Sequence, residues 1–131
     1  MRDALWPGSL SDHEIETAEY FVSRGLTARV FVAEMDNRLV GVLELGYRPD
    51  AEGCASSPVP FIEGWYVEPE CQGRGIGRAL VEAAEASARA DGYTEMASDV
   101  LLENTESIAA HEALGYEEVE RRVCFRKTLT G

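Results

Sequence analysis

The spacing of apolar and polar residues changes along the chain, and each change marks a predicted element. Apolar residues at helical spacing predict an amphipathic helix between positions 11 and 25, which begins with a capping-box pattern and ends at Gly25. Segments 28–34 and 39–45 are rich in residues that favour strands, and Asp36-Asn37 between them indicates a hairpin turn. The chain is therefore predicted to begin with a helix and a hairpin.

The rest of the pattern alternates strands with helices. It predicts a loop at 48–60, a buried strand at 61–67, an Ala-rich helix at 76–90, a strand at 93–99, a helix at 105–114 and one or more strands at 119–129. This order of elements is typical of an α/β (α+β) fold, in which a mixed sheet has helices on both faces.

Length and composition limit the class of protein. At 131 residues the chain is predicted to form one domain, 1–131. It has no apolar run near the roughly 20 residues of a membrane span and no signal-peptide pattern, so we expect a cytoplasmic protein. Cys54, Cys71 and Cys124 lack metal-type spacing, which favours reduced thiols. With two histidines and no ligand-type pair, no metal site is expected.

The net charge of −12 limits the kinds of ligand that the protein is expected to bind. Nucleic-acid binding needs a basic face to neutralise phosphates, so the charge argues against it. A cationic substrate drawn to an acidic cleft is compatible with this charge. Surface carboxylates that serve solubility alone would give the same number, so both interpretations stay open.

The stretch at 67–80 contains the most specific pattern: a strand end, a glycine-rich turn and the start of a helix. Glycines at alternate positions let backbone amides approach a ligand closely. The partial positive charge of a helix N-terminus favours phosphate, and two arginines add full charges. We predict a pyrophosphate cradle, and the residues concerned are Gly73, Arg74, Gly75, Gly77 and Arg78.

Two common phosphate motifs are excluded by this spacing. A Walker A loop requires G-x-x-x-x-G-K-S/T, and no lysine follows these glycines. A dinucleotide fingerprint requires G-x-G-x-x-G near the start of a βαβ unit, whereas this run is G-x-G-x-G and lies past the middle of the chain.

The segment Gln72-Gly73-Arg74-Gly75-Ile76-Gly77, after a strand that ends in Tyr66-Val67-Glu68-Pro69, resembles the Q/R-x-x-G-x-G/A motif of the GNAT superfamily of acetyl-CoA-dependent N-acetyltransferases. The resemblance implies a mostly antiparallel, twisted sheet flanked by helices. That fold has a strand ahead of its first helix, which this sequence is expected to lack. It also implies that coenzyme A is held by Val67, Gln72, Gly73, Arg74, Gly75, Ile76, Gly77, Arg78 and Asn104.

Further segments, in order along most of the chain, are similar to one branch, the aminoglycoside 6′-N-acetyltransferases. They include Phe61-Ile62-Glu63-Gly64, Glu95-Met96-Ala97-Ser98-Asp99 and His111-Glu112-Ala113-Leu114-Gly115-Tyr116. The resemblance implies an aminoglycoside pocket in which Glu63, Asp99 and Glu120 bind amines and Trp6 lines the wall. A polycationic sugar suits such carboxylates. A solvated surface role for each carboxylate, and a packing role for Trp6, remain the alternatives.

The reaction implied is direct transfer of acetyl to a primary amine in a ternary complex. A backbone N–H near Val67, freed by the strand bulge that the family has there, would hold the oxyanion. Glu63 is the candidate general base, directly or through water. His111 is a candidate for protonating the thiolate, with a packed helical histidine as the alternative. Phe125 stands where the branch often has a tyrosine, and phenylalanine cannot donate a proton.

Other functions stay open at this point. The chain would also suit an N-acetyltransferase for another polyamine, such as spermidine, or for a peptide N-terminus. A non-catalytic acyl-CoA-binding module is the third hypothesis, since the expected missing strand and Phe125 would fit lost catalysis. The family resemblance also implies a homodimer, formed through the C-terminal strands.

Overall fold

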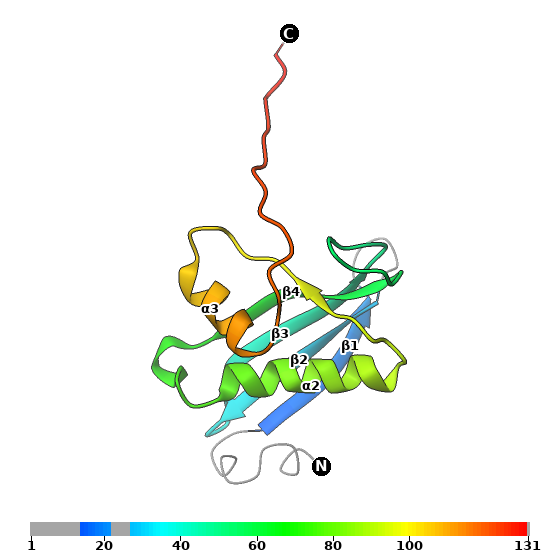
Figure 1. Cartoon of the computed structure of the whole chain (residues 1–131). Helices are drawn as coiled ribbons and strands as arrows, with labels where there is room; N and C mark the ends of the chain where they lie inside the picture. Colours follow the sequence, from blue (N-terminus) through cyan, green and yellow to red (C-terminus); the bar gives the residue numbers. More distant parts are fainter. Residues whose placement is uncertain (1–13, 22–26, 131) are drawn as a thin grey trace. The chain divides into compact units, whose positions relative to one another are not determined.

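The computed structural model of the chain describes residues 14–21 and 27–130, and it divides into two compact units, Met1–Asp99 and Val100–Gly131. The first unit contains a five-stranded sheet in the order β1-β2-β3-β4-β5 (Figure 1). Its elements are β1 (Glu14–Phe21), β2 (Thr27–Met35), β3 (Arg38–Arg48), β4 (Val59–Val67), the 3₁₀ helix η2 (Pro69–Cys71), α2 (Ile76–Ala90) and β5 (Ala97–Ser98).

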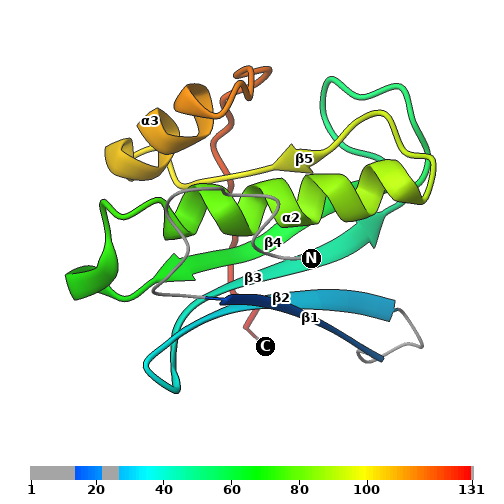
Figure 2. The same cartoon turned by 90° about the horizontal axis from the view of Figure 1, so that it is seen from below.

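The first four strands are antiparallel neighbours, and β5 runs parallel to β4. Helix α2 makes the crossover between β4 and β5 and lies along one face of the sheet (Figure 2). Its buried residues, among them Ile76, Leu80 and Val81, pack with strand residues such as Phe31 and Leu43 to form the core. Burying each such side chain contributes about 1.5–3 kcal/mol, so this layer fixes where the start of α2 meets the end of β4.

The predicted helix at 76–90, the mixed sheet and the hairpin turn are confirmed. Asp36 and Asn37 both have positive φ, 53° and 65°, as a two-residue hairpin turn requires. The end of α2 is also as expected. Gly92 has φ 91°, and the Tyr93 amide donates to the Ala88 carbonyl at 3.0 Å, which closes a Schellman motif.

The predicted helix at 11–25 is wrong where the structure describes it, because residues 14–21 form strand β1. Strand β1 pairs with β2 so that Ile15 is opposite Ala33 and Thr17 is opposite Phe31. Pairing with a neighbouring strand overrides a local spacing pattern. The expected absence of a strand ahead of the chain's first helix concerns residues outside those that the structure describes.

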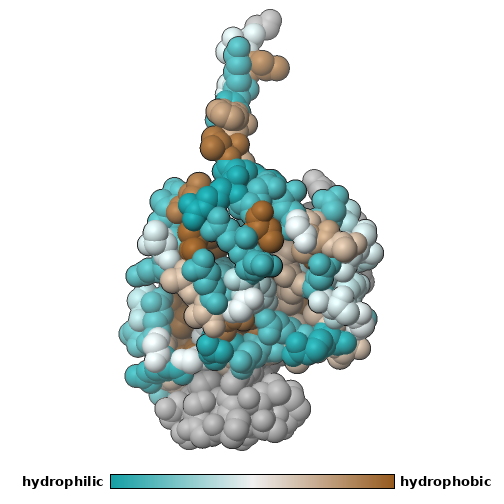
Figure 3. Space-filling model, in the orientation of Figure 1, coloured by the Kyte–Doolittle hydropathy of each residue, from teal (hydrophilic) through white to brown (hydrophobic). Residues whose placement is uncertain are grey.

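The second unit contains helix α3 (Thr105–Ala113), close to its predicted range. Gly115, with φ 93°, ends it through a second Schellman motif, in which the Tyr116 amide donates to the His111 carbonyl at 3.0 Å. The predicted strands at 119–129 are wrong: within the second unit as described, no strand follows α3. A strand needs a partner, and this segment instead exposes Val123, Phe125 and Leu129. Hydrophobic residues are visible along the extended C-terminal part of the chain (Figure 3).

Over residues 14–21 and 27–130, the structure contains no helix with the length and apolar character needed to cross a membrane.

Candidate functional site

The glycine turn lies between β4 and α2 and is built on two left-handed glycines. Gly73 has φ 82° and Gly75 has φ 83°, a backbone conformation that other L-residues rarely adopt. A Cβ atom at either position would meet nothing within 4 Å. Glycine is therefore required here by the backbone conformation, and the space beside both residues is open to a ligand.

The start of α2 presents backbone amides. The first helical hydrogen bond is donated by Ala79 to the Gly75 carbonyl at 2.9 Å, so the preceding amides of the first turn have no partner within the helix. Gly75 is the N-cap and has no side chain to satisfy them, and the first turn contains no acidic residue. Such a helix start suits an anion, as the sequence predicts.

Gly77 has a different role from the other two glycines. A Cβ atom there would lie 3.3 Å from the Trp65 ring, and the Trp65 Nε1–H donates to the Gly77 carbonyl at 3.2 Å. The absence of a side chain at Gly77 thus lets α2 pack closely on β4. The sequence suggested that all three glycines open the backbone to a ligand; for Gly77 the structure shows helix–strand packing.

The candidate oxyanion donor, Val67, is held from two sides. Its carbonyl accepts a hydrogen bond from Gln72 Nε2 at 3.1 Å, which ties the turn to the end of β4. The next amide, that of Glu68, donates to the Val40 carbonyl at 2.8 Å. Antiparallel neighbours alternate between bonded and non-bonded pairs, so the Val67 N–H is directed away from β3. On that side β5 pairs with β4, among the described residues, only at Phe61 and Ile62.

The expected strand bulge is elsewhere. Val67 pairs regularly with Gly41, and the register shifts where Gly64 pairs with Glu44 and Ile62 with Leu45. This leaves Glu63 as the extra residue of β4. The prediction of a bulge near Val67 is therefore wrong: the alternation of the ladder, not a bulge, directs the Val67 amide outward.

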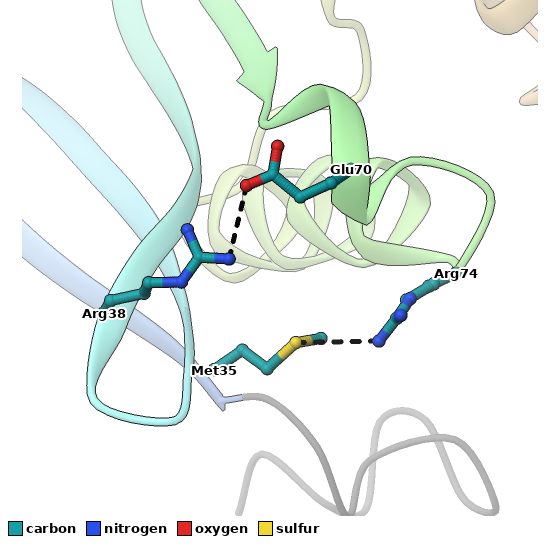
Figure 4. Close-up of polar contacts among 4 residues, drawn as sticks. All are labelled: Met35, Arg38, Glu70 and Arg74. Atoms are coloured by element: carbon teal, nitrogen blue, oxygen red, sulfur yellow. Dashed lines mark hydrogen bonds and ion pairs between the residues drawn. The ribbon is translucent and has the colours of Figure 1, made fainter.

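The arginines of the turn have partners on nearby elements. Arg74 lies 3.7 Å from the Met35 sulfur, and Arg38 lies 3.4 Å from Glu70, so the β2–β3 hairpin lies beside the turn (Figure 4). Arg78 lies 3.6 Å from Glu82, one helical turn further along α2. The ion pairs of Arg38 and Arg78 are exposed and weak, of the order of 0–1 kcal/mol, and among these contacts Arg74 meets only a neutral sulfur, so a phosphate can compete for the arginines.

A second group of charges lies in the middle of β4, just after the residues that pair with β5. Strand β5 pairs Ala97 with Phe61 and Ser98 with Ile62, and the next positions in that parallel register are Asp99 and Glu63. The structure thus brings together two of the residues that the sequence assigned to substrate binding. Asp99 directly follows the carboxyl end of β5, and Glu63 is the extra residue at the register shift of the neighbouring strand β4. Open α/β sheets bind ligands at the carboxyl ends of their strands.

Sequence reasoning missed a third member of this group, Arg48, the last residue of β3. Its Nε lies 2.9 Å from Glu63 Oε2 and its Nη2 lies 2.7 Å from Oε1, a two-bond ion pair. Its guanidinium carbon is 3.5 Å from the centre of the Phe61 ring. Hydrogen bonding to Glu63, followed by the charges of Glu63 and Asp99, raises the pKa of the Arg48 guanidinium against the opposing effect of burial. Arg48 and Glu63 are on different strands and meet where the register of those strands shifts, so no local sequence pattern predicts their ion pair.

Glu95 anchors the loop that follows β3. Its Oε1 accepts hydrogen bonds from the Ala55 amide at 2.9 Å, the Ser56 amide at 2.8 Å and the Ser56 hydroxyl at 2.6 Å. The hydrogen bonds from Ser56 lower the pKa of the Glu95 carboxyl. These hydrogen bonds fix the loop that begins just after Arg48 to the segment that precedes β5.

We expect Glu95→Gln to lower the melting temperature at pH 7. The folded-state pKa of Glu95 lies below its ordinary value of 4.5, so its stabilising contribution is present above that pH and is lost as pH falls through the folded-state pKa. Thermal unfolding of wild type and variant at several pH values measures this. The gap in melting temperature should narrow in acid, and a gap that stays constant would show that the ionised carboxylate is not responsible.

Three predicted site residues lie in the second unit. Asn104 is the N-cap of α3, where its Oδ1 accepts from the Ser107 amide at 3.1 Å. His111 Nδ1 lies 2.7 Å from the Ser107 carbonyl, and its ring meets Tyr116 edge-on at 5.7 Å. Glu120 is exposed and lies 3.0 Å from Arg122. Trp6 lies outside the described residues.

The chain is matched over residues 1–116 by the model of the acetyltransferase (GNAT) family, and it belongs to that family. It is 47% identical to an aminoglycoside N(6′)-acetyltransferase type 1 of Klebsiella aerogenes, over 98% of this chain and 87% of the relative. A protein of the same name from Stenotrophomonas maltophilia is 42% identical, over 98% of this chain and 84% of the relative.

Solved structures give the same result. The aminoglycoside N-acetyltransferase AAC(6′)-Iy in complex with CoA matches with a TM-score of 0.73 at 40% identity, over 78% of this chain and 77% of that one. The same enzyme with the bisubstrate analogue CoA-S-monomethyl-acetylneamine matches with a TM-score of 0.72 at 34% identity, over 98% of this chain and 88% of that one. The GNAT-like α+β fold predicted from the sequence is thereby confirmed.

Proposed function

We propose that this protein uses acetyl-CoA to acetylate the 6′-amino group of aminoglycosides. The observation that carries the proposal is the placement of two carboxylates: Glu63 is on the strand that leads into the glycine turn, and Asp99 directly follows β5, the parallel neighbour of that strand. An aminoglycoside is polycationic, and paired carboxylates favour binding of ammonium groups. The full-length similarity to aminoglycoside N(6′)-acetyltransferases supports the same acceptor.

For the cofactor, we propose that the turn amides and Arg74 hold the pyrophosphate of coenzyme A, with Arg78 nearby on α2. The preceding amides of the first turn of α2 have no partner within the helix, and that turn contains no acidic residue, which supports this role. Gln72 positions Val67 through its carbonyl, and Gly77 sets the approach of α2 to β4. Asn104 stays a proposed cofactor residue on the family resemblance alone.

In the reaction we propose, the neutral 6′-amine attacks the thioester carbonyl carbon. The Val67 N–H stabilises the oxyanion, the carbon–sulfur bond then breaks, and the thiolate leaves. Glu63 precedes Val67 by four residues on the same strand and would accept the amine proton through water. His111 Nδ1 faces a carbonyl and must donate to it, which leaves only Nε2 for a proton transfer to the thiolate.

The function is tested by mixing the purified protein with acetyl-CoA and kanamycin or tobramycin and following free thiol. Thiol release with drugs that carry a 6′-amine is expected. If no thiol is released with any drug of such a panel, the proposed function is contradicted. Turnover of spermidine or a peptide amine alone would favour a different acetyltransferase, and tight acetyl-CoA binding without any turnover would favour a binding module.

Asp99→Asn is expected to weaken aminoglycoside binding by about tenfold, because a hydrogen bond to a charged group contributes about 1.5–3 kcal/mol. Acetyl-CoA affinity should change little, since Asp99 follows β5 and the turn follows β4. Calorimetric titration of the drug and of coenzyme A measures both. Equal loss of both affinities would contradict the assignment of Asp99.

We also propose that the two units act as one acetyltransferase domain, 1–131, in a cytoplasmic homodimer. The alternating exposed apolar residues of the C-terminal segment, among them Val123 and Phe125, support pairing with a second copy of the chain. Light scattering during gel filtration measures the assembly, and a monomer at micromolar concentration would count against the dimer. Glu120 and Trp6 stay proposed pocket residues.

A further inference from the structure

Arg48 forms an ion pair with Glu63, the carboxylate to which the proposed aminoglycoside acceptor would bind. Both oxygens of Glu63 accept from its guanidinium, at 2.9 and 2.7 Å. A Cβ atom at Gly46 would lie 3.1 Å from Glu63 Cγ and 3.3 Å from Oε2, so the glycine leaves room for the Glu63 side chain to lie along β3 toward Arg48. The absence of a side chain at Gly46 on β3 thus permits the ion pair between Arg48 and Glu63.

Arg48 also lies in the field of the second carboxylate. The charge of Asp99 acts on the Arg48 guanidinium, and Asp99 and Glu63 are the next positions after the paired residues of β5 and β4. A guanidinium and a protonated amine carry the same charge and seek the same carboxylates. An ammonium group that approaches Glu63 therefore meets a site that already holds a cation.

The pair is nevertheless able to open. The side chains of Arg48 and Glu63 are 42% and 31% exposed, so water screens their attraction and reaches both groups. Arg48 leans on the Phe61 ring face, a contact that an exposed arginine exchanges for water at small cost. A ligand with stronger or more numerous charges can displace it.

We propose that Arg48 is a specificity-determining residue: an internal cation that occupies Glu63 until a polycationic acceptor displaces it. An amine with one charge exchanges one ion pair for another and gains little. A polyamino sugar brings several ammonium groups, which engage Glu63 and Asp99 together. The proposal rests on the proposed function and names how its acceptor site selects polycations.

The test is a double-mutant cycle on tobramycin affinity, measured by calorimetry on the full chain saturated with coenzyme A. Arg48→Gln is expected to bind tobramycin about fivefold more tightly than wild type, since an exposed ion pair contributes up to about 1 kcal/mol. In the Glu63→Gln background, the same change is expected to strengthen binding less than about twofold, because the competed carboxylate is gone. Arg89→Gln removes the same charge from the last turn of α2 and is the matched control, with unchanged affinity expected.

Weaker binding by Arg48→Gln would overturn the proposal, because it would show that Arg48 positions Glu63 in the bound state. An equal gain in both backgrounds would overturn it too, since Glu63 would not be the group competed for. If Arg48→Gln does not fold, Arg48→Lys keeps the cation and loses the two-bond fork. It is expected to bind more tightly than wild type, and equal or weaker binding contradicts the proposal. Wild-type protein that acetylates no 6′-amine refutes the proposed function instead.

Discussion

Replacing Glu63 with glutamine is expected to lower kcat for acetylation of tobramycin by about 100-fold or more, the usual contribution of a general base. Glutamine keeps the size of the side chain and accepts no proton at neutral pH. Coenzyme A affinity should stay within about twofold, because Glu63 lies four residues before Val67 and makes its contacts with Arg48. Steady-state kinetics with a thiol probe, together with calorimetry of coenzyme A, measure the two effects separately.

The matched control for this substitution is Glu118→Gln. Glu118 also makes a two-bond ion pair, with Arg121 at 2.6 and 3.0 Å, and the substitution removes the same charge. It is expected to leave kcat unchanged. A loss at Glu63→Gln that falls wholly on KM would show that Glu63 binds the amine and does not take its proton. A change in kcat of less than about threefold would remove Glu63 from the proton path.

The parts of the fold that the sequence predicted are those with local causes. Helix α2 has a continuous apolar stripe and a glycine at each end, so both its span and its boundaries could be predicted. The turn at Asp36-Asn37 and the glycine turn are set by residues that tolerate positive φ. In each case the burial or the backbone conformation of a position limits which residue types can stand there, so the residue type indicates the local structure.

The errors have non-local causes. Residues 14–21 were predicted as helix because their apolar residues stand three apart, but pairing with β2 decides their structure. Segment 119–129 has a strand-like pattern and no partner strand within its described unit, so its pattern alone does not make a strand. Both segments depend on a neighbour that sequence periodicity does not encode.

The candidate site divides in the same way. The glycine turn could be predicted because its glycines and arginines are contiguous in the sequence. The pair of Arg48 with Glu63 could not, because the two residues are 15 positions apart and meet across a register shift. The outward direction of the Val67 amide was expected for a different reason, a bulge, that the structure places at Glu63.

The two glycines at the ends of α2 offer a direct test of whether the glycine turn binds coenzyme A, as proposed. Gly75 has φ 83° and Gly92 has φ 91°, and a Cβ atom at either would meet nothing within 4 Å. Alanine at each position should therefore cost a similar free energy of unfolding, about 1–2 kcal/mol for left-handed backbone. Only Gly75→Ala is also expected to weaken coenzyme A binding, by about tenfold, because backbone that relaxes toward negative φ turns the amides away from the phosphates.

Chemical denaturation and coenzyme A calorimetry on both variants separate stability from binding. Gly92→Ala is the control, since it carries the same strain on the same helix at the end away from the turn. Equal loss of coenzyme A affinity in both variants would mean that general destabilisation of α2, and not the turn, weakens binding. Unchanged affinity in Gly75→Ala would mean that the pyrophosphate is not held by the amides of this turn, and the cofactor would have to bind elsewhere on the protein.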